Sequence, residues 1–186
     1  MKTTAIPPTL IILSGLPGCG KSTMAAHLSS HLHCPVLAID DVTSALPSHL
    51  TQHSPNYWED MVGILLHLAD SYLDWFPFLI IDSVFMGVDP NHTIHSWSDR
   101  LRAQQIAHKH NINYRPIYLY LSDEQIWRQR LTTRAAQYNN PEIATWSQVS
   151  HQRHLFQPWQ PDQALFIDSL NPLTTNLHTI LAYLQS

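Results

Sequence analysis

The sequence predicts an α/β domain built on a parallel sheet, and two observations carry this prediction. Short apolar runs alternate along the chain with longer segments in which apolar residues recur at helical spacing. Two of these runs end at an aspartate, and the first ends directly before a cluster of glycines. The chain has 186 residues, 44% of them hydrophobic, and no repeat or linker divides it. We therefore expect a single domain over residues 1–186.

The first half of the chain contains the clearest elements. In order, we expect a strand at 9–14, a helix from about Lys21, a strand at 35–39, an amphipathic helix after a loop bracketed by Pro47 and Pro55, and a strand at 78–81. The apolar stripe of the amphipathic helix consists of Trp58, Met61, Val62, Leu65, Leu68, Ala69 and Tyr72. Gly63 lies inside this helix, where glycine costs about 1 kcal/mol relative to alanine.

The second half is more polar, and its elements are shorter. We expect a helix at 98–110, a strand at 117–121, a helix at 123–134, a strand at 164–167 and a closing helix at 171–184. Residues 135–162 are polar and interrupted by prolines. Their aromatic anchors are Trp146, Phe156 and Trp159.

Glycine is scarce in this chain and concentrated in one place. Three of the five glycines, Gly15, Gly18 and Gly20, fall within six positions, where the backbone is expected to adopt unusual conformations. They belong to Gly15-Leu16-Pro17-Gly18-Cys19-Gly20-Lys21-Ser22-Thr23, which matches the phosphate-loop pattern G-x-x-x-x-G-K-[ST]. Because this segment follows a buried strand and opens a helix, its backbone N–H groups form an anion site. We expect all nine residues to bind the phosphates of a nucleotide.

Lys21 and Ser22 have separate expected roles in this loop. Lys21 is predicted to reach the β- and γ-phosphates, and the Ser22 hydroxyl is predicted to ligate Mg²⁺. ATP and Mg²⁺ are therefore the predicted cofactors. The chain has no Asn-Lys-x-Asp guanine signature, which favours ATP over GTP.

Two aspartates are expected beyond the carboxyl ends of strands, where ligands bind in open α/β sheets. Asp40 is predicted to accept a proton from an attacking hydroxyl. The alternative is a helix cap, for which Asp41 is the better candidate. Asp82 is predicted to hold Mg²⁺ directly or through water, with a turn-forming aspartate as the alternative. Ser83 follows it in place of the water-activating glutamate of motor-type ATPases, which argues against that class.

Three of the seven arginines, Arg128, Arg130 and Arg134, lie within seven residues. Arg130 and Arg134 are one helical turn apart and share a face, so we expect them to stabilise charge on a transferring phosphoryl group. Arg128 is displaced from that face and is expected in solvent. A polar helix face is the alternative for the cluster, and it is the preferred interpretation for Arg100 and Arg102.

Charge and composition narrow the classes of partner. Lys and Arg number 10 against 14 Asp and Glu, a net charge of −4, so no global basic field supports nucleic-acid binding. Cys19 and Cys34 form no disulfide framework, which favours a reducing cytoplasm. No apolar run approaches the roughly 18 residues of a membrane span, and the run Leu10–Leu13 is too short for a signal-peptide core. We expect a cytoplasmic protein that binds no membrane.

These residues together resemble the P-loop kinase superfamily, and within it the small AAA-type ATP-binding domains of chloramphenicol phosphotransferases, zeta toxins and polynucleotide kinases. The chloramphenicol phosphotransferase pattern of a strand ending in Asp and followed by Ala-Met-Pro resembles Ile39-Asp40-Asp41-Val42-Thr43-Ser44-Ala45-Leu46-Pro47. Its Ile-Asp-Asp-Val-Phe-Leu-Gly segment resembles Ile81-Asp82-Ser83-Val84-Phe85-Met86-Gly87.

The resemblance implies a P-loop NTPase fold, with three α/β/α layers, a five-stranded parallel sheet in the order 2-3-1-4-5 and a small helical lid at about 134–153. It also implies ATP-dependent phosphorylation of a hydroxyl, with Asp40 as the base and Arg130 or Arg134 as lid groups on the phosphates. Thr43 stands where polynucleotide kinases place an arginine, which weakens a nucleic-acid substrate. The loop at 47–60, expected to line the acceptor site, shares little with either group, so the acceptor does not transfer.

The predicted function is an ATP-dependent kinase for a hydroxyl of a small molecule. Its predicted catalytic residues are Lys21, Asp40, Arg130 and Arg134. Candidate walls of the acceptor pocket are Tyr57, Trp58, Phe85 and Met86, with core packing as the alternative. Two other functions stay open: a polynucleotide 5′-hydroxyl kinase, and a non-catalytic module gated by nucleotide in which Asp40 is structural.

Overall fold

The computed structural model describes residues 6–46, 57–86, 99–137 and 145–186. Its five strands form one parallel sheet in the order β2-β3-β1-β4-β5, as the resemblance implied. The strands are β1 (Thr9–Ser14), β2 (Val36–Ala38), β3 (Phe78–Asp82), β4 (Asn113–Tyr120) and β5 (Leu165–Asp168). The helices are α1 (Lys21–Leu32), α2 (Ile39–Ala45), α4 (Tyr57–Tyr72), α5 (Asp99–Lys109), α6 (Glu124–Gln137), α7 (Trp146–Leu155) and α8 (Leu173–Gln185).

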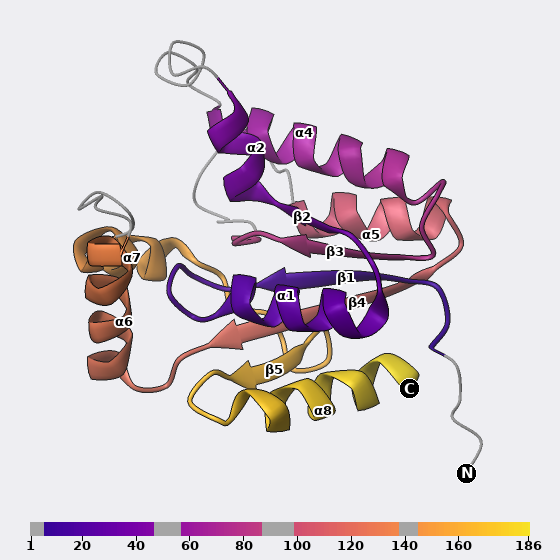
Figure 1. Cartoon of the computed structure of the whole chain (residues 1–186). Helices are drawn as coiled ribbons and strands as arrows, with labels where there is room; N and C mark the ends of the chain where they lie inside the picture. The colour runs from indigo at the N-terminus through magenta and orange to yellow at the C-terminus, as the bar shows by residue number, and fades with distance from the viewer. Residues whose placement is uncertain (1–5, 47–56, 87–98, 138–144) are drawn as a thin grey trace.

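Different helices cover the two faces of the sheet, so the molecule has three layers (Figure 1). Along β1, Leu10 and Ile12 pack with residues of α4 and α5, whereas Ile11 and Leu13 pack with residues of α1 and α8. This alternation follows from the period of two along a strand. All six residues of β1 are buried, as expected for the central strand of a parallel sheet that is covered on both faces.

A third, smaller apolar cluster lies at the carboxyl ends of the strands, where α6 and α7 pack together (Figure 1). Trp127 and Leu131 of α6 and Val149 of α7 are buried in it, together with Leu16 of the phosphate loop. The region predicted as a lid at 134–153 thus contains the end of α6 and most of α7, and residues 138–144 lie outside the described residues. The edge of the sheet that carries the phosphate loop is therefore packed directly against α6.

Several expected boundaries differ from the structure, and two of the differences have a clear physical cause. The strand expected at 35–39 ends at Ala38, and α2 begins at Ile39. Asp40 and Asp41 lie in the first turn of α2. Negative side chains there stabilise the helix, because they interact favourably with the helix dipole. The strand expected at 117–121 begins at Asn113 and includes Pro116. The residues of β4 up to Pro116 pair with β1 alone, so only one side of the strand needs backbone donors there.

Candidate active site

The phosphate loop connects β1 to α1, and its glycines adopt the conformations that their clustering predicted. Gly15, Gly18 and Gly20 have φ angles of 144°, 83° and 92°, in the region that other residues avoid. A Cβ at Gly15 would collide with the carbonyl oxygen of Leu119. The loop therefore accepts no side chain at this position without moving β4.

The N-terminus of α1 directly follows the phosphate loop. Gly20 is its N-cap residue, and among the described residues no side chain caps the helix, so this helix end can receive an anion. Lys21 Nζ lies 3.4 Å from the carbonyl oxygen of Leu16, to which it donates. The ammonium group thus folds back over the loop, at the position expected for a group that contacts phosphates.

Asp82 is the last residue of β3, and its carboxylate lies beside α1. The residue is buried, with 4% of its surface exposed, and this burial raises the pKa of its carboxyl group. Lys21 and a hydrogen bond from Ser22 oppose this shift, whereas the charge of Asp40 adds to it. Asp82 is therefore a buried carboxylate beside the Ser22 hydroxyl and the Lys21 ammonium group. Among the salt bridges of the described residues, none includes Asp82.

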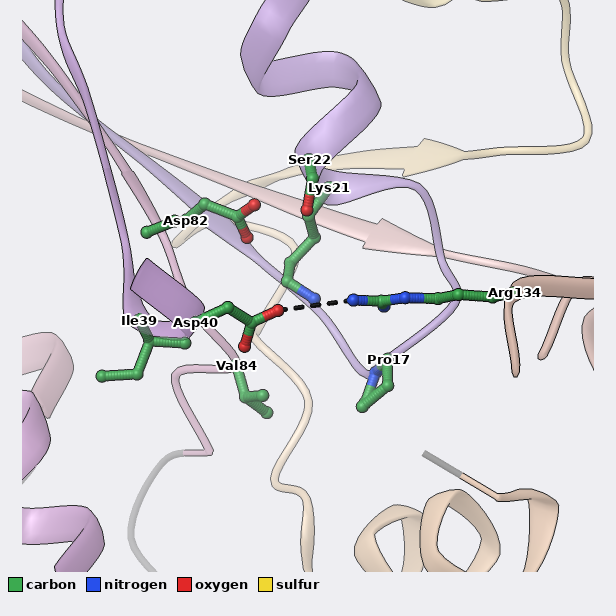
Figure 2. Close-up of a pocket in the computed structure, with 9 residues that line it drawn as sticks. Pro17, Lys21, Ser22, Ile39, Asp40, Asp82, Val84 and Arg134 are labelled. Carbon is green, nitrogen blue, oxygen red and sulfur yellow. Dashed lines mark hydrogen bonds and ion pairs between the residues drawn. The ribbon is translucent and has the colours of Figure 1, made fainter. Parts of the chain in front are cut away.

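Asp40 lies across the site from α6 and forms an ion pair with Arg134. Arg134 Nη2 is 3.4 Å from Asp40 Oδ2, and the side chains are 36% and 72% exposed. Figure 2 shows the Lys21 ammonium group, the Asp40 carboxylate and the Arg134 guanidinium group turned toward one another. These groups come from α1, α2 and α6, so three separate elements converge here.

A pocket joins these residues into one site. Its lining consists of Pro17, Lys21, Ser22, Ala38, Ile39, Asp40, Asp82, Val84 and Arg134 (Figure 2). Six of the residues predicted for nucleotide, metal or catalysis therefore line the same pocket: Pro17, Lys21, Ser22, Asp40, Asp82 and Arg134. The chemistry this allows is anion binding at a helix N-terminus, in a pocket lined by two carboxylates and two cationic side chains.

The other arginines of α6 do not line this pocket. Arg130 Nη2 donates to the carbonyl oxygen of Ser169, at 3.0 Å, in the turn that follows β5. Ser169 in turn donates through its hydroxyl to the carbonyl oxygen of Cys19, so Arg130 approaches the phosphate loop from the side opposite to Asp40. Arg128 is more than half exposed and pairs with Glu124 at 2.7 Å, as expected for an arginine on the solvent side.

The four residues suggested as acceptor-pocket walls do not line the pocket. Phe85 is 1% exposed and belongs to the core formed with α4 and α5, so core packing is its role. Trp58 is 62% exposed on α4. Val84, which the sequence did not single out, lines the pocket in their place. Residues 47–56 of the loop expected to line the acceptor site, and Gly87, lie outside the described residues.

Sequence patterns also missed several residues that hold the site in shape. Trp127 Nε1 donates to the Pro17 carbonyl oxygen at 2.7 Å, and Trp159 Nε1 donates to Ser14 Oγ at 2.9 Å. Arg100, expected on a polar helix face, instead donates to the carbonyl oxygens of Phe85 and Gln157. Apolar periodicity marks the two tryptophans only as buried, because the acceptor of each hydrogen bond is distant in sequence.

A phosphate-loop sequence that opens α1, in a parallel sheet of order β2-β3-β1-β4-β5, is the arrangement of the P-loop NTPase fold, and this protein has that fold. Residues 10–159 match the model of the family named AAA domain, so the chain belongs to that family. Among the described residues, no helix is long and apolar enough to cross a membrane.

Solved structures share this fold over nearly the whole chain. A protein from Chloroflexus aurantiacus J-10-fl is 22% identical, with a TM-score of 0.69 over 96% of this chain and 97% of its own. A gluconokinase from Sinorhizobium meliloti 1021 is 16% identical, with a TM-score of 0.67 over 97% of this chain and 93% of its own. The APS kinase CysC of Mycobacterium tuberculosis, in complex with AMPPNP and APS, is 16% identical, with a TM-score of 0.66 over 98% of this chain and 100% of its own. No curated protein in the comparison matches the chain.

Proposed function

We propose that this protein is an ATP- and Mg²⁺-dependent kinase that phosphorylates a hydroxyl group of a small molecule. The observation that carries the proposal is the pocket in which Lys21, Ser22, Asp40, Asp82 and Arg134 meet. Phosphoryl transfer needs little covalent chemistry from a protein, and depends on positioning and on charge stabilisation. These five side chains supply both.

The residues of the pocket fit a nucleoside triphosphate and Mg²⁺. The uncapped N-terminus of α1 and the three glycines with positive φ provide backbone N–H donors for phosphate oxygens. Ser22 and Asp82 offer a hydroxyl and a carboxylate side by side, and both are oxygen ligands of the kind that Mg²⁺ prefers. When bound, Mg²⁺ would neutralise charge on the β- and γ-phosphate oxygens.

Each catalytic side chain then has a defined task. Lys21 withdraws charge from the phosphoryl group that is transferred. Asp40 accepts the proton of the attacking hydroxyl, since it is an exposed carboxylate that lines the pocket. The acceptor displaces Arg134 from Asp40, and the guanidinium group then stabilises the charge that develops on the equatorial oxygens.

Arg130 receives a different role in this proposal from the one that its spacing suggested. Its bond to Ser169 places it beside the turn that contacts Cys19, away from Asp40 and Arg134. A Cβ at Gly20 would come within 3.5 Å of Ser169 Oγ, so this turn lies at the entrance of α1. We assign Arg130 to holding the nucleotide rather than to the reacting phosphoryl group.

Three further observations support a small acceptor and a reducing compartment. The net charge of −4 provides no extended basic groove for a polynucleotide. Gluconokinase and APS kinase, two proteins of the same fold, bear the names of small-molecule substrates. Cys19 and Cys34 are free and buried, and burial raises the pKa of both thiols, that of Cys34 to about 11. A cytoplasmic location suits an enzyme that consumes ATP and keeps both thiols reduced.

The test is a screen for transfer of the γ-phosphoryl group from labelled ATP to hydroxyl-bearing metabolites and antibiotics, with a 5′-hydroxyl oligonucleotide in the same panel. The Lys21→Ala variant, purified in parallel, controls for contaminating kinases. Transfer to a small molecule by the wild type alone supports the proposal. Transfer to the oligonucleotide alone would identify a polynucleotide kinase, and nucleotide binding without transfer to any compound would favour the non-catalytic module.

A further inference from the structure

The phosphate loop accepts a hydrogen bond from a tryptophan that lies far away in the sequence. Trp127, in the first half of α6, is 5% exposed. Its indole N–H donates to the carbonyl oxygen of Pro17 over 2.7 Å, and 110 residues separate the two positions. A bond of this length from a buried donor is well formed, and it joins α6 to the middle of the loop.

The same part of α6 also packs against the next residue of the loop. A Cβ at Gly18 would lie 2.8 Å from Leu131 Cδ2 and 3.0 Å from Trp127 Nε1, both closer than carbon and nitrogen atoms normally approach a Cβ. Leu16 is buried in the same cluster as Trp127 and Leu131. Three consecutive residues of the loop, 16–18, therefore rest on α6.

This contact determines how one peptide group of the loop is oriented. The carbonyl of Pro17 and the N–H of Gly18 belong to a single planar trans peptide, so they point in opposite directions. When the indole holds the carbonyl toward α6, the Gly18 N–H faces away from α6. Within the described residues, that N–H donates to no backbone carbonyl in the loop region, which leaves it available to an anion.

We propose that Trp127 is a positioning residue for nucleotide binding, because its bond to Pro17 presents the Gly18 N–H to the phosphates. The inference rests on the nucleotide-binding part of the proposed function, and does not depend on the identity of the acceptor. Trp127 is the residue that fixes this peptide before nucleotide arrives, so the loop does not lose that freedom on binding.

The test compares Trp127→Phe with Trp146→Phe as a matched control. Phenylalanine keeps an aromatic ring on α6 but removes the N–H donor. Trp146 contacts Trp127 edge-on, with ring centroids 5.9 Å apart, so its replacement disturbs the same cluster and leaves the bond to Pro17 in place. Calorimetry with Mg²⁺–AMPPNP should show affinity about five- to tenfold weaker in Trp127→Phe, the usual effect of losing one buried hydrogen bond, and within about twofold of wild type in Trp146→Phe.

A second measurement uses the wild type only, so it remains informative even if Trp127→Phe fails to fold. In ¹H–¹⁵N spectra of the wild type, addition of Mg²⁺–AMPPNP should move the Gly18 amide resonance downfield, while the Trp127 indole N–H stays protected from exchange. Unchanged affinity in Trp127→Phe, or a Gly18 resonance that does not move, overturns the inference and leaves nucleotide binding intact. A wild type that binds no nucleotide overturns both this inference and the proposed function.

Discussion

Replacement of Asp40 by asparagine separates catalysis from structure more cleanly than any other change in the site. Asparagine has nearly the same shape as aspartate, but it carries no charge and cannot accept the proton of an attacking hydroxyl. If Asp40 is the general base, transfer should fall by about 10²- to 10⁴-fold. The affinity for nucleotide should stay within about twofold of the wild type, because the phosphate loop and Lys21 are unchanged.

The structure indicates that the same change has little effect on stability. The ion pair lost is 3.4 Å long and joins a 72% exposed carboxylate to a 36% exposed guanidinium group, and such exposed pairs contribute about 0.2–1 kcal/mol. Asp40 also lies in the first turn of α2, where a negative charge contributes about 0.3–1 kcal/mol. Removal of its charge relieves Asp82, whose pKa Asp40 helps to raise. The melting temperature should therefore fall by no more than about 5 °C.

The assay follows transfer from labelled ATP to the acceptor found in the screen, with Asp41→Asn as the control. Asp41 is the next residue of the same helical turn, but it does not line the pocket. Asp41→Asn should retain activity within about threefold, since it alters the helix dipole in the same way and touches no reacting group. Transfer by Asp40→Asn at the wild-type rate would refute the assignment of the base. A large loss of stability in Asp40→Asn alone would show that the residue is structural.

Three further predictions concern nucleotide affinity and stability. Lys21→Ala should weaken ATP binding at least about tenfold by calorimetry, and unchanged affinity would contradict the phosphate-loop assignment. Gly63→Ala should raise the free energy of unfolding by about 0.5–1 kcal/mol in urea titrations, because the added Cβ meets Arg102 Nη2 at an ordinary 3.8 Å; a decrease would show that α4 needs glycine there. Lys109, and to a smaller degree His110, hold the pKa of Asp70 below its usual value, so Asp70→Asn should destabilise the protein by about 1 kcal/mol at pH 6. That deficit should shrink as the pH falls below about 4 through the lowered pKa, and a deficit independent of pH would exclude the charge as its cause.

The central part of the fold could be predicted because its physical signals are local. A strand buried on both faces must be apolar at every position, and Leu10–Leu13 and Leu79–Ile81 meet that condition. A loop that requires positive φ angles at three positions must contain glycine at them. In both cases the constraint acts on consecutive residues, so a short stretch of sequence expresses it completely.

The position of Asp40 shows where such local reasoning ends. The apolar run at 35–39 is continuous, but only three of its residues form a strand, and Ile39 turns into the core as the first residue of α2. Two acidic residues at 40 and 41 are equally consistent with a strand end and with the first turn of a helix. The choice between them depends on how α2 packs against α4, which periodicity within one segment does not express.

The arginines of α6 show a second limit of prediction from sequence. Residue spacing predicts that two side chains share a helix face, but it does not predict the partner that each of them reaches. Arg130 and Arg134 do share a face, as their spacing predicts. One helical turn nevertheless separates them by about 5.4 Å along the axis, and that length is enough to give them different partners. Arg134 reaches Asp40 on one side of the phosphate loop, and Arg130 reaches Ser169 on the other. Helical spacing predicts the direction of a side chain but not what lies opposite each turn.

The spacing of residues along α6 explains how Arg134 reaches the pocket. Trp127, Leu131 and Arg134 follow one another at intervals of four and three residues, so they lie on one face of α6. The first two rest on the phosphate loop, through the bond to Pro17 and the contact with Gly18. Arg134 extends from that same anchored face to Asp40. Its position at the pocket therefore follows from the contact between α6 and the loop.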